Sequence, residues 1–479
     1  MAPPPLANEL WYEICAFLPL EAIRNLSSAD HDFHVLVRPL GFSEYHVVPH
    51  SHLYIPPPEH LERASQRLDF YSSPEIAPRV RACIAKVPDR LLHPRQSSAD
   101  GAPTALMRTF YDRLAVFTRL QRLEFSNIRM TQKGLNSVCT LPALTHLSFD
   151  LCSFERWEDV TGIKIPLRVA SLTANESQSL LAPLSQIMSP DTLEELHFGN
   201  LAALTAEKVG PFPHLHTLKV LDDIFYSEAE ALDVLANFPA VRTCCIKYNG
   251  MLGDLTADAA AVIFPDLQKY AGNYLNLNLF HLRPALSHIT LFPLAPSLRF
   301  EELIFELGDV DALPNITSFK AQFEAYDFGF PEVCRLLTLL PHLSELRLRL
   351  TSDLMDGHGF VLLDPVFLLE SISAQGILPL TLQTFSIVYD AVPLKLMNPA
   401  WDSMDFGAIR NRFQERCPDL AYFYVNVHHF SFLWWKNDPV WEITTRSRGD
   451  TTLLESKLLE YRKARMADSI LNADDLYYS

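Results

Sequence analysis

Glycine and basic residues are both scarce in this chain, and each shortage argues against a class of function. Only 16 of the 479 residues are glycine, about half the usual share of ~7 %. Phosphate-binding loops and dinucleotide-binding folds need glycine where the backbone approaches the ligand. Acidic residues outnumber basic ones by 57 to 40, which gives a net charge of −17 at pH 7. Such a chain repels phosphate backbones and anionic lipids, so we expect neither nucleic acid nor a membrane as its partner.

Long apolar runs are also lacking. No stretch reaches the roughly 18 consecutive apolar residues that predict a membrane span, and no Lys or Arg precedes Arg24, so we expect no secretory signal. The eight cysteines are widely spaced, apart from the adjacent Cys244 and Cys245. A chain of this length can fold without disulfides. We therefore expect reduced thiols and a cytoplasmic or nuclear location, or both.

The common catalytic motifs are missing as well. The sequence has no His-Glu-x-x-His, no Gly-x-Ser-x-Gly, no P-loop and no Cys-x-x-Cys, so we expect no enzyme, no cofactor and no metal. A zinc site formed by His214, His216, Cys244 and Cys245 is the alternative, because these residues lie one repeat apart. Adjacent residues of a strand point in opposite directions, which favours core packing for the two cysteines.

Leucine dominates what is present, with 75 residues, and it follows a repeat. The unit is apolar-x-x-apolar-x-apolar, and apolar-proline pairs such as Leu141-Pro142 and Leu340-Pro341 often precede it. Proline there ends the preceding helix just before a strand begins. The copies are Leu120-Leu123-Phe125, Leu144-Leu147-Phe149, Leu167-Ala170-Leu172, Leu193-Leu196-Phe198, Leu215-Leu218-Val220, Val241-Cys244-Ile246, Ile316-Phe319-Ala321, Leu343-Leu346-Leu348, Leu382-Phe385-Ile387 and Leu420-Phe423-Val425.

The first six copies start 22 to 26 residues apart, which is the spacing and pattern of the leucine-rich repeat. We predict an irregular α/β solenoid over 119–430, with parallel strands on the concave face and helices on the convex face. A helical linker and N-terminal cap would occupy 49–118. A C-terminal cap would occupy 431–479, including a helix with Leu454, Leu458 and Tyr461 on one face. Between 267 and 316 the register stays open, because the triplets beginning at Leu286 and at Phe300 both fit.

Residues 1–48 predict a compact three-helix unit. Leu10, Ile14 and Phe17 share one face of a first helix that Pro19 ends, and Asp30 can cap the third. In order and spacing this unit resembles an F-box, although Ala7 replaces the usual proline and Phe33 stands where tryptophan is common. The resemblance, to fungal F-box proteins with degenerate leucine-rich repeats, implies binding to a Skp-type adaptor and through it to a cullin. We expect the adaptor contacts at Leu10, Ile14, Leu18, Pro19, Ile23 and Leu26.

The resemblance further implies the substrate-receptor subunit of a Skp–cullin–F-box ubiquitin ligase, whose repeats hold an unidentified protein substrate. The alternative is a leucine-rich-repeat scaffold that recruits no ligase. In either case the third, fifth and seventh positions of each repeat should face outward from the core. The early repeats place Arg122, Glu124, His146, Asp150, Glu195 and His197 there. We predict that substrate binds the late repeats, at Lys320, Arg347, Arg349, Tyr389, Tyr422 and Tyr424. Glu345 and neighbouring acids could instead neutralise the cations.

Overall fold

The computed structural model describes the chain in segments that cover most of the predicted repeats. The chain divides into two compact units, Met1–Leu215 and His216–Ser479. The described residues are 10–11, 14–15, 18, 20–29, 31–49, 57–87, 105–154, 164–174, 187–199, 211–220, 233–246, 262–292, 300–307, 312–324, 330–351, 365–374, 376–390, 405–427, 430–436 and 442–445.

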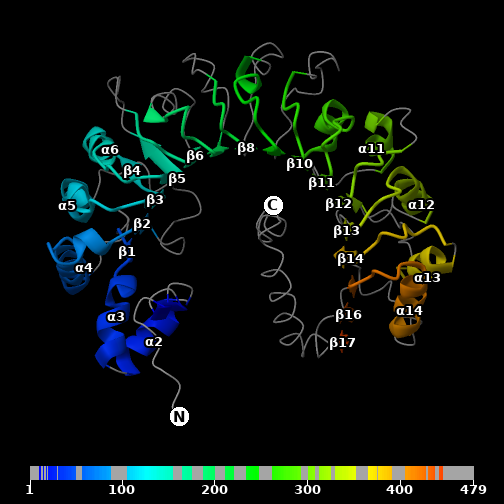
Figure 1. Cartoon of the computed structure of the whole chain (residues 1–479), viewed down its shortest axis with the longest axis horizontal. Coiled ribbons are helices and arrows are strands. Elements are labelled where there is room, and N and C mark those ends of the chain that lie inside the picture. Colours follow the sequence, from blue (N-terminus) through cyan, green and yellow to red (C-terminus); the bar gives the residue numbers. More distant parts are fainter. Residues whose placement is uncertain are drawn as a thin grey trace. The chain divides into compact units, whose positions relative to one another are not determined.

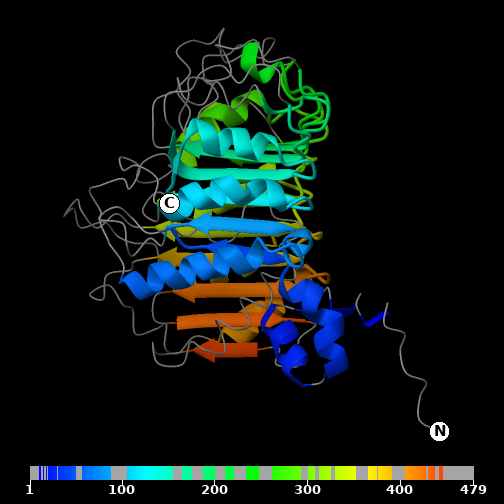
Figure 2. The ribbon, with the colours of Figure 1, turned by 90° about the vertical axis from the view of Figure 1, so that its left-hand side faces the viewer.

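The first unit combines helices with a parallel sheet. Strands β1, β2, β3, β5, β6 and β7 pair in that order, each parallel to the next. Figure 2 shows α4, α5 and α6 lying along one face of these strands. The elements are α2 (Leu20–Ala29), α3 (His31–Gly41), β1 (Glu44–Val47), α4 (Pro58–Tyr71), η1 (Ala77–Arg79), β2 (Ala82–Lys86), α5 (Ala105–Arg113), η4 (Leu114–Val116), β3 (Arg122–Ser126), β4 (Arg129–Met130), α6 (Gln132–Cys139), β5 (His146–Phe154), β6 (Val169–Ala174) and β7 (Glu195–Phe198).

The second unit continues the same pattern and ends differently. Strands β8 to β15 pair in chain order and in parallel, whereas β16 and β17 add on antiparallel. Its labelled helices lie on one side of the strands (Figure 1). The elements are β8 (Thr217–Val220), β9 (Thr243–Ile246), β10 (Lys269–Gly272), η7 (Tyr274–Leu279), β11 (His288–Leu291), α11 (Phe300–Leu307), β12 (Ser318–Glu324), α12 (Phe330–Leu339), β13 (Glu345–Thr351), α13 (Pro365–Ala374), β14 (Thr384–Asp390), α14 (Phe406–Arg416), β15 (Tyr422–Val427), β16 (Phe430–Trp435) and β17 (Glu442–Thr445).

Each predicted triplet forms a strand, and its apolar residues form the core between strands and helices. Leu218, Ile246 and Leu346 are buried, as predicted. Identical positions of neighbouring repeats stack. The rings of Phe125 and Phe149 lie parallel with centroids 5.4 Å apart, and Phe385 and Phe423 do the same at 5.3 Å. Burying such a side chain stabilises the fold by about 2–3 kcal/mol. One strand per repeat in a parallel sheet is the leucine-rich-repeat type of fold.

The sheet begins earlier than the predicted start at residue 119. β1 pairs with β2, and β2 with β3, so both strands extend the parallel sheet into the predicted linker and N-terminal helical region. Tyr45, Val47, Cys83 and Ala85 supply their buried positions. These strands fit the repeat pattern but contain no leucine at the pattern positions, which is why the leucine count did not reveal them.

The open register between 267 and 316 is resolved by two strands and a helix. Leu286 precedes β11, whose Ile289 and Leu291 are buried, whereas Phe300 begins helix α11. β10 supplies a further repeat with Tyr270 and Gly272. A Cβ on Gly272 would lie 2.6 Å from the backbone oxygen of Ile246, so this inward position accepts only glycine without a backbone shift.

At the C-terminal end, the predicted cap consists in part of the antiparallel strands β16 and β17. Phe432 and Trp434 of β16 are buried, and the Phe432 ring stacks on that of Phe406 in α14 with centroids 5.7 Å apart. The Arg410 guanidinium lies 5.3 Å from the centroid of the Trp434 ring. The predicted helix with Leu454, Leu458 and Tyr461 lies outside the described residues.

Candidate functional site

The candidate site lies on the sheet face opposite the helices, which we call the outward face. It carries the third, fifth and seventh positions of each repeat. Because the strands are parallel and in register, equal positions form rows across the sheet. The fifth-position row of the late repeats runs Thr290, Lys320, Arg347, Ser386 and Tyr424. Residues far apart in sequence therefore form one continuous surface.

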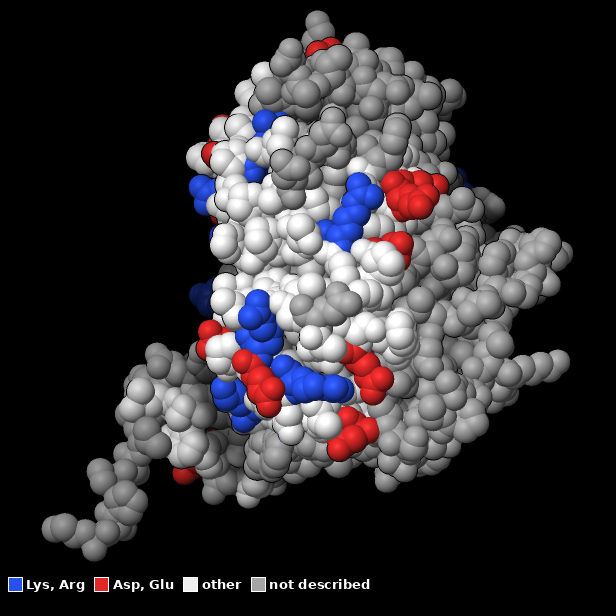
Figure 3. Space-filling model, turned by 90° about the vertical axis from the view of Figure 1, so that its right-hand side faces the viewer, with Lys and Arg blue, Asp and Glu red and all other residues white. Residues whose placement is uncertain are grey.

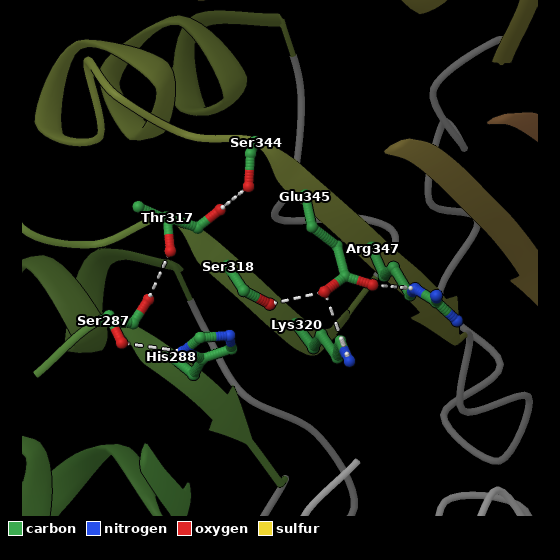
Figure 4. A network of polar contacts seen from close by, with 8 residues as sticks. All are labelled: Ser287, His288, Thr317, Ser318, Lys320, Ser344, Glu345 and Arg347. Atoms are coloured by element: carbon green, nitrogen blue, oxygen red, sulfur yellow. Dashed lines mark hydrogen bonds and ion pairs between the residues drawn. The ribbon is translucent and has the colours of Figure 1, made fainter. Parts of the chain in front are cut away.

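Glu345 is the centre of a polar network on this face (Figure 4). Its Oε2 accepts a hydrogen bond of 2.7 Å from Ser318 Oγ and lies 3.4 Å from Lys320 Nζ. Its Oε1 accepts a hydrogen bond of 2.7 Å from Arg347 Nε. Glu345 is only 7 % exposed, and a buried carboxylate is costly unless it is paired and hydrogen-bonded. Glu345 is paired with both cations.

This network bears on the two expectations for Lys320 and Arg347. Both cations pair with Glu345, the acid named in the alternative, but they share a single carboxylate, so substrate binding at these residues stays a prediction. Both side chains nevertheless remain partly exposed, at 22 % and 30 %. Arg349, two residues further along β13, is also partly exposed and lies in register with Gln322 and Val388. The Glu345 carboxylate thus holds Lys320 and Arg347 in place on a surface that also carries Arg349.

Hydroxyl groups extend the network along the starts of the strands. Ser344 Oγ donates to the backbone oxygen of Thr317 at 2.8 Å, and Thr317 Oγ1 donates to that of Ser287 at 3.3 Å. Ser287 Oγ lies 2.8 Å from His288 Nδ1 (Figure 4). These contacts join the entries of β11, β12 and β13. They fix the register of the strands that present Lys320 and Arg347.

The predicted tyrosines are placed differently from the expectation. Tyr389 is the eighth residue of its repeat, shares the parity of Phe385 and Ile387, and is buried on the core face. The prediction that Tyr389 faces outward was wrong, because the seventh, outward position of this repeat is Val388. Tyr422 and Tyr424 do lie on the outward face, yet they are only 3 % and 7 % exposed. They form an apolar group that we call the aromatic cluster, made of Val388, Tyr422, Tyr424, Leu433 and the partly buried Trp435.

A second outward position also differs from prediction. Lys219 and Arg347 are partly exposed, as expected, but Cys245 is fully buried. It packs with Ala271 and Phe292 on neighbouring strands of the outward face. Cys244 lies on the core face, so the two thiols diverge. No group of three or more His, Cys, Asp or Glu with metal-binding geometry occurs within the described ranges.

The early repeats present a different outward face. Arg122 pairs with Glu124 on the same strand, and His197 Nε2 lies 2.6 Å from Glu195 Oε1. Asp150 accepts hydrogen bonds of 3.0 Å from Ser126 and Thr173 on the flanking strands. Burial, together with the charges of Arg122 and Arg168, lowers the pKa of His146. These contacts lie between neighbours on a solvated surface.

The N-terminal helical residues divide into a small core and an exposed pair. Cys15, Ile23 and Val37 are buried together, with Leu18, Leu26 and Leu40 packed against them. Leu10 and Ile14 are 47 % and 44 % exposed. The predicted adaptor contact Ile23 is 6 % exposed and packs inward with Cys15 and Val37. Its contact with an adaptor stays a prediction. The side chain of Pro19 lies outside the described residues.

The helix-covered side of the second unit is a weaker candidate. Figure 3 shows acidic and basic side chains interspersed there, with uncharged surface between them. Phe367 and Leu380 are exposed apolar residues of this unit, but single exposed apolar side chains are ordinary on protein surfaces. No helix among the described residues has the length and apolar character needed to cross a membrane.

Sequence reasoning missed Val388, Leu433 and Trp435 as outward residues. Val388 is the seventh position of its repeat, so strict counting finds it in place of Tyr389. Leu433 and Trp435 belong to β16, whose antiparallel pairing with β15 no repeat signal reveals.

No protein-family model and no curated protein matches the chain. Among solved structures, the chain is similar to one described as the crystal structure of the TLR13–ssRNA13 complex, with 15 % sequence identity and a TM-score of 0.38. The match covers 72 % of this chain and 42 % of that chain.

Proposed function

We propose that this chain is the substrate-receptor subunit of a Skp–cullin–F-box ubiquitin ligase. Its N-terminal helices would bind a Skp-type adaptor, and the outward face of its late repeats would bind the protein to be ubiquitinated. In this role the chain brings two partners together and carries out no chemical step itself. The parallel repeat sheet supports the broader role, because rows of outward side chains form an extended surface for a protein partner.

The exposed pair Leu10 and Ile14 carries the adaptor proposal. The two residues are four positions apart in helical conformation, so they share one face. They lie beside the small core of Cys15, Ile23 and Val37 without being buried in it. Trp11 is held by an edge-to-face contact with Phe33, with ring centroids 5.2 Å apart. An apolar pair on an ordered helical unit is a suitable anchor for a partner.

The test is co-purification of the full chain with the Skp-type adaptor of its own cell. We expect Leu10→Asp/Ile14→Asp to weaken adaptor binding by at least tenfold, because each charge would have to be desolvated in an apolar interface. The matched control is Leu282→Asp, since Leu282 is an equally apolar and more exposed residue of the second unit. Circular dichroism should show that all variants stay folded. Unchanged adaptor capture by the double variant would refute the assignment of this contact.

A repeat scaffold without a ligase partner is the second candidate, and one observation favours it. Leu18 and Leu26, both predicted adaptor contacts, already pack against the buried core of the N-terminal helices. Such a unit could serve only to cover the start of the solenoid. Failure of the unmodified chain to bind any Skp-type adaptor would support this candidate over the first.

A further inference from the structure

The outward face of β8 to β13 differs in charge from the chain as a whole. Over the full sequence, acidic residues outnumber basic ones by 57 to 40. At the third and fifth positions of these strands the balance is reversed, because Glu345 is the one acidic residue there. The basic residues at the same positions are Lys219, Lys269, Lys320 and Arg347.

The equivalent positions in the first unit show the opposite balance. β3, β5, β6 and β7 hold Glu124 and Glu195 there, and Arg122 is their one Lys or Arg. Arg122 is moreover paired with Glu124 on its own strand. The positive character of β8 to β13 therefore belongs to this part of the sheet and does not come from the repeat pattern itself.

The register of the strands brings these cations into one group. The fifth-position row begins with Lys219 in β8 and reaches Lys320 in β12 and Arg347 in β13, which are direct neighbours. Lys269 occupies the third position of β10, midway between the strands of Lys219 and Lys320. Since adjacent strands lie about 4.8 Å apart, successive lysines are separated by about 10 Å across the sheet.

Small side chains lie between Lys219 and Lys320 in the fifth-position row. Cys245, Ala271 and Thr290 occupy this interval, and each is at most 8 % exposed. Lys219 and Lys269 are partly exposed, and a lysine keeps its charged end in water while its stem lies along apolar surface. The ammonium groups therefore stand above a floor of small side chains.

We propose that the outward face of β8 to β13 binds an extended acidic segment of a protein partner. Carboxylates of this segment pair with Lys219, Lys269 and Lys320. The inference rests on the proposed function, for which it specifies the chemistry of the protein to be ubiquitinated.

The spacing and type of the cations favour several carboxylates along an extended chain. Such a chain advances about 3.3 Å per residue, so acidic residues three positions apart match the separation of about 10 Å between the lysines. Lysine offers a point charge, whereas arginine offers the planar fork that binds one phosphate through two hydrogen bonds. Because lysines predominate at these positions, a row of carboxylates suits the face better than a single phosphate group.

A nucleic acid suits the face less well. Proteins that bind single strands without sequence preference combine basic grooves with aromatic side chains on which the bases stack. None of the third and fifth positions of β8 to β13 holds Phe, Tyr or Trp. The face therefore offers charge without a stacking platform, which favours a protein segment as its partner.

Fluorescence anisotropy of a labelled polyglutamate peptide with the full chain tests the proposal. We expect binding at least tenfold tighter at 0.01 M than at 0.15 M ionic strength, because the screening length falls from about 30 Å to about 8 Å. Lys219→Glu/Lys269→Glu should weaken binding at least fivefold at the lower ionic strength. Lys320 is left in place, since its replacement would also disturb Glu345.

The matched control is Arg335→Glu/Arg412→Glu. Both arginines are exposed on helices of the same unit, α12 and α14. The control therefore changes the net charge equally on the helix-covered side, and it should leave binding within twofold. Lys219→Gln/Lys269→Gln removes the two charges without adding new ones and should weaken binding at least twofold. Circular dichroism should show that all variants stay folded.

Three results would overturn the proposal. The unmodified chain could fail to bind polyglutamate at the lower ionic strength. The two glutamate double variants could lose binding equally, which would show that only the net charge matters. A single-stranded oligodeoxythymidine of the same charge could bind more tightly than polyglutamate and depend on Lys219 and Lys269, which would identify a nucleic acid as the partner.

Failure of this inference can be distinguished from failure of the proposed function. A chain that captures no Skp-type adaptor but binds polyglutamate through Lys219 and Lys269 would refute the ligase role and keep this surface. A chain that captures the adaptor but does not bind polyglutamate would keep the ligase role and refute the acidic segment.

Discussion

The outward faces of the two units are built on the same strand geometry but have opposite character. In the first unit, Arg122 and Glu124 pair on one strand, and Asp150 bridges to its neighbours on a solvated surface. In the second unit, Glu345 and Tyr422 occupy equivalent third positions and are almost fully buried. The repeat determines which side chains face outward, but it does not determine which of those side chains are buried.

This difference follows from what each face must satisfy. Inward positions must fill the space between strand and helix, so they are apolar in every repeat. Outward positions have no such requirement, and exposed pairs such as Arg122–Glu124 contribute little to stability. Outward residues of the second unit such as Tyr422 are buried all the same, so the repeat pattern alone does not set their environment.

The largest effects should be equal in the two units. Phe125→Ala and Phe385→Ala each remove a buried ring from a stack in the core. Each should lower the free energy of unfolding by about 3–5 kcal/mol, through lost burial and a cavity. Urea unfolding followed by circular dichroism measures both. A loss below 1 kcal/mol in one unit only would mean that the inward faces are not built alike.

A smaller effect should separate the two outward faces. Tyr422 and His146 hold the same third position of their repeats, yet Tyr422 is buried in the aromatic cluster and His146 is exposed. We expect Tyr422→Ala to cost about 2–4 kcal/mol of unfolding free energy, and His146→Ala less than about 0.5 kcal/mol. Thermal unfolding of both variants would check this. Equal losses would remove the distinction between the two faces.

The smallest effect concerns His146 alone. Burial first, and then the charges of Arg122 and Arg168, lower its pKa below 6.5. Arg122→Gln should therefore raise the pKa of His146, which NMR titration of the imidazole measures. The unfolded chain binds this proton more tightly than the folded chain does, so protonation of His146 favours unfolding. The contribution of His146 to stability is therefore complete above about pH 6.5 and falls as the pH drops below that value. A pKa at or above 6.5 in the unmodified chain would contradict the placement of His146 between the two arginines.

The sequence predicted the strands well wherever leucine marked the repeat. The triplets from Leu120 to Leu420 became β3, β5 to β9 and β12 to β15, because inward packing constrains residue type at fixed spacing. β1 and β2 escaped notice because Tyr45, Cys83 and Ala85 fill their inward positions. Phe300, Leu303, Ile304 and Leu307 follow helical spacing, a signal that distinguishes α11 from a strand.

The candidate site was only partly predictable. Counting repeat positions correctly placed Lys320, Arg347 and Tyr424 on the outward face, and it identified Glu345 as the acid that could neutralise them. It could not show that Tyr424 is buried, because that depends on contacts between segments distant in sequence. For the same reason, Ile23 could be placed on a helix face but not assigned to a core with Cys15 and Val37.

A double-mutant cycle tests the central comparison most directly. The cycle would measure the coupling free energy between Glu345 and Arg347 in the second unit, and between Glu124 and Arg122 in the first, by urea unfolding of the single and double glutamine variants. The buried, hydrogen-bonded pair around Glu345 should give a coupling of about 1.5 kcal/mol, and the exposed pair less than about 0.5 kcal/mol. Couplings that are equal within error would contradict the account, because the two outward faces would then provide the same environment for charge.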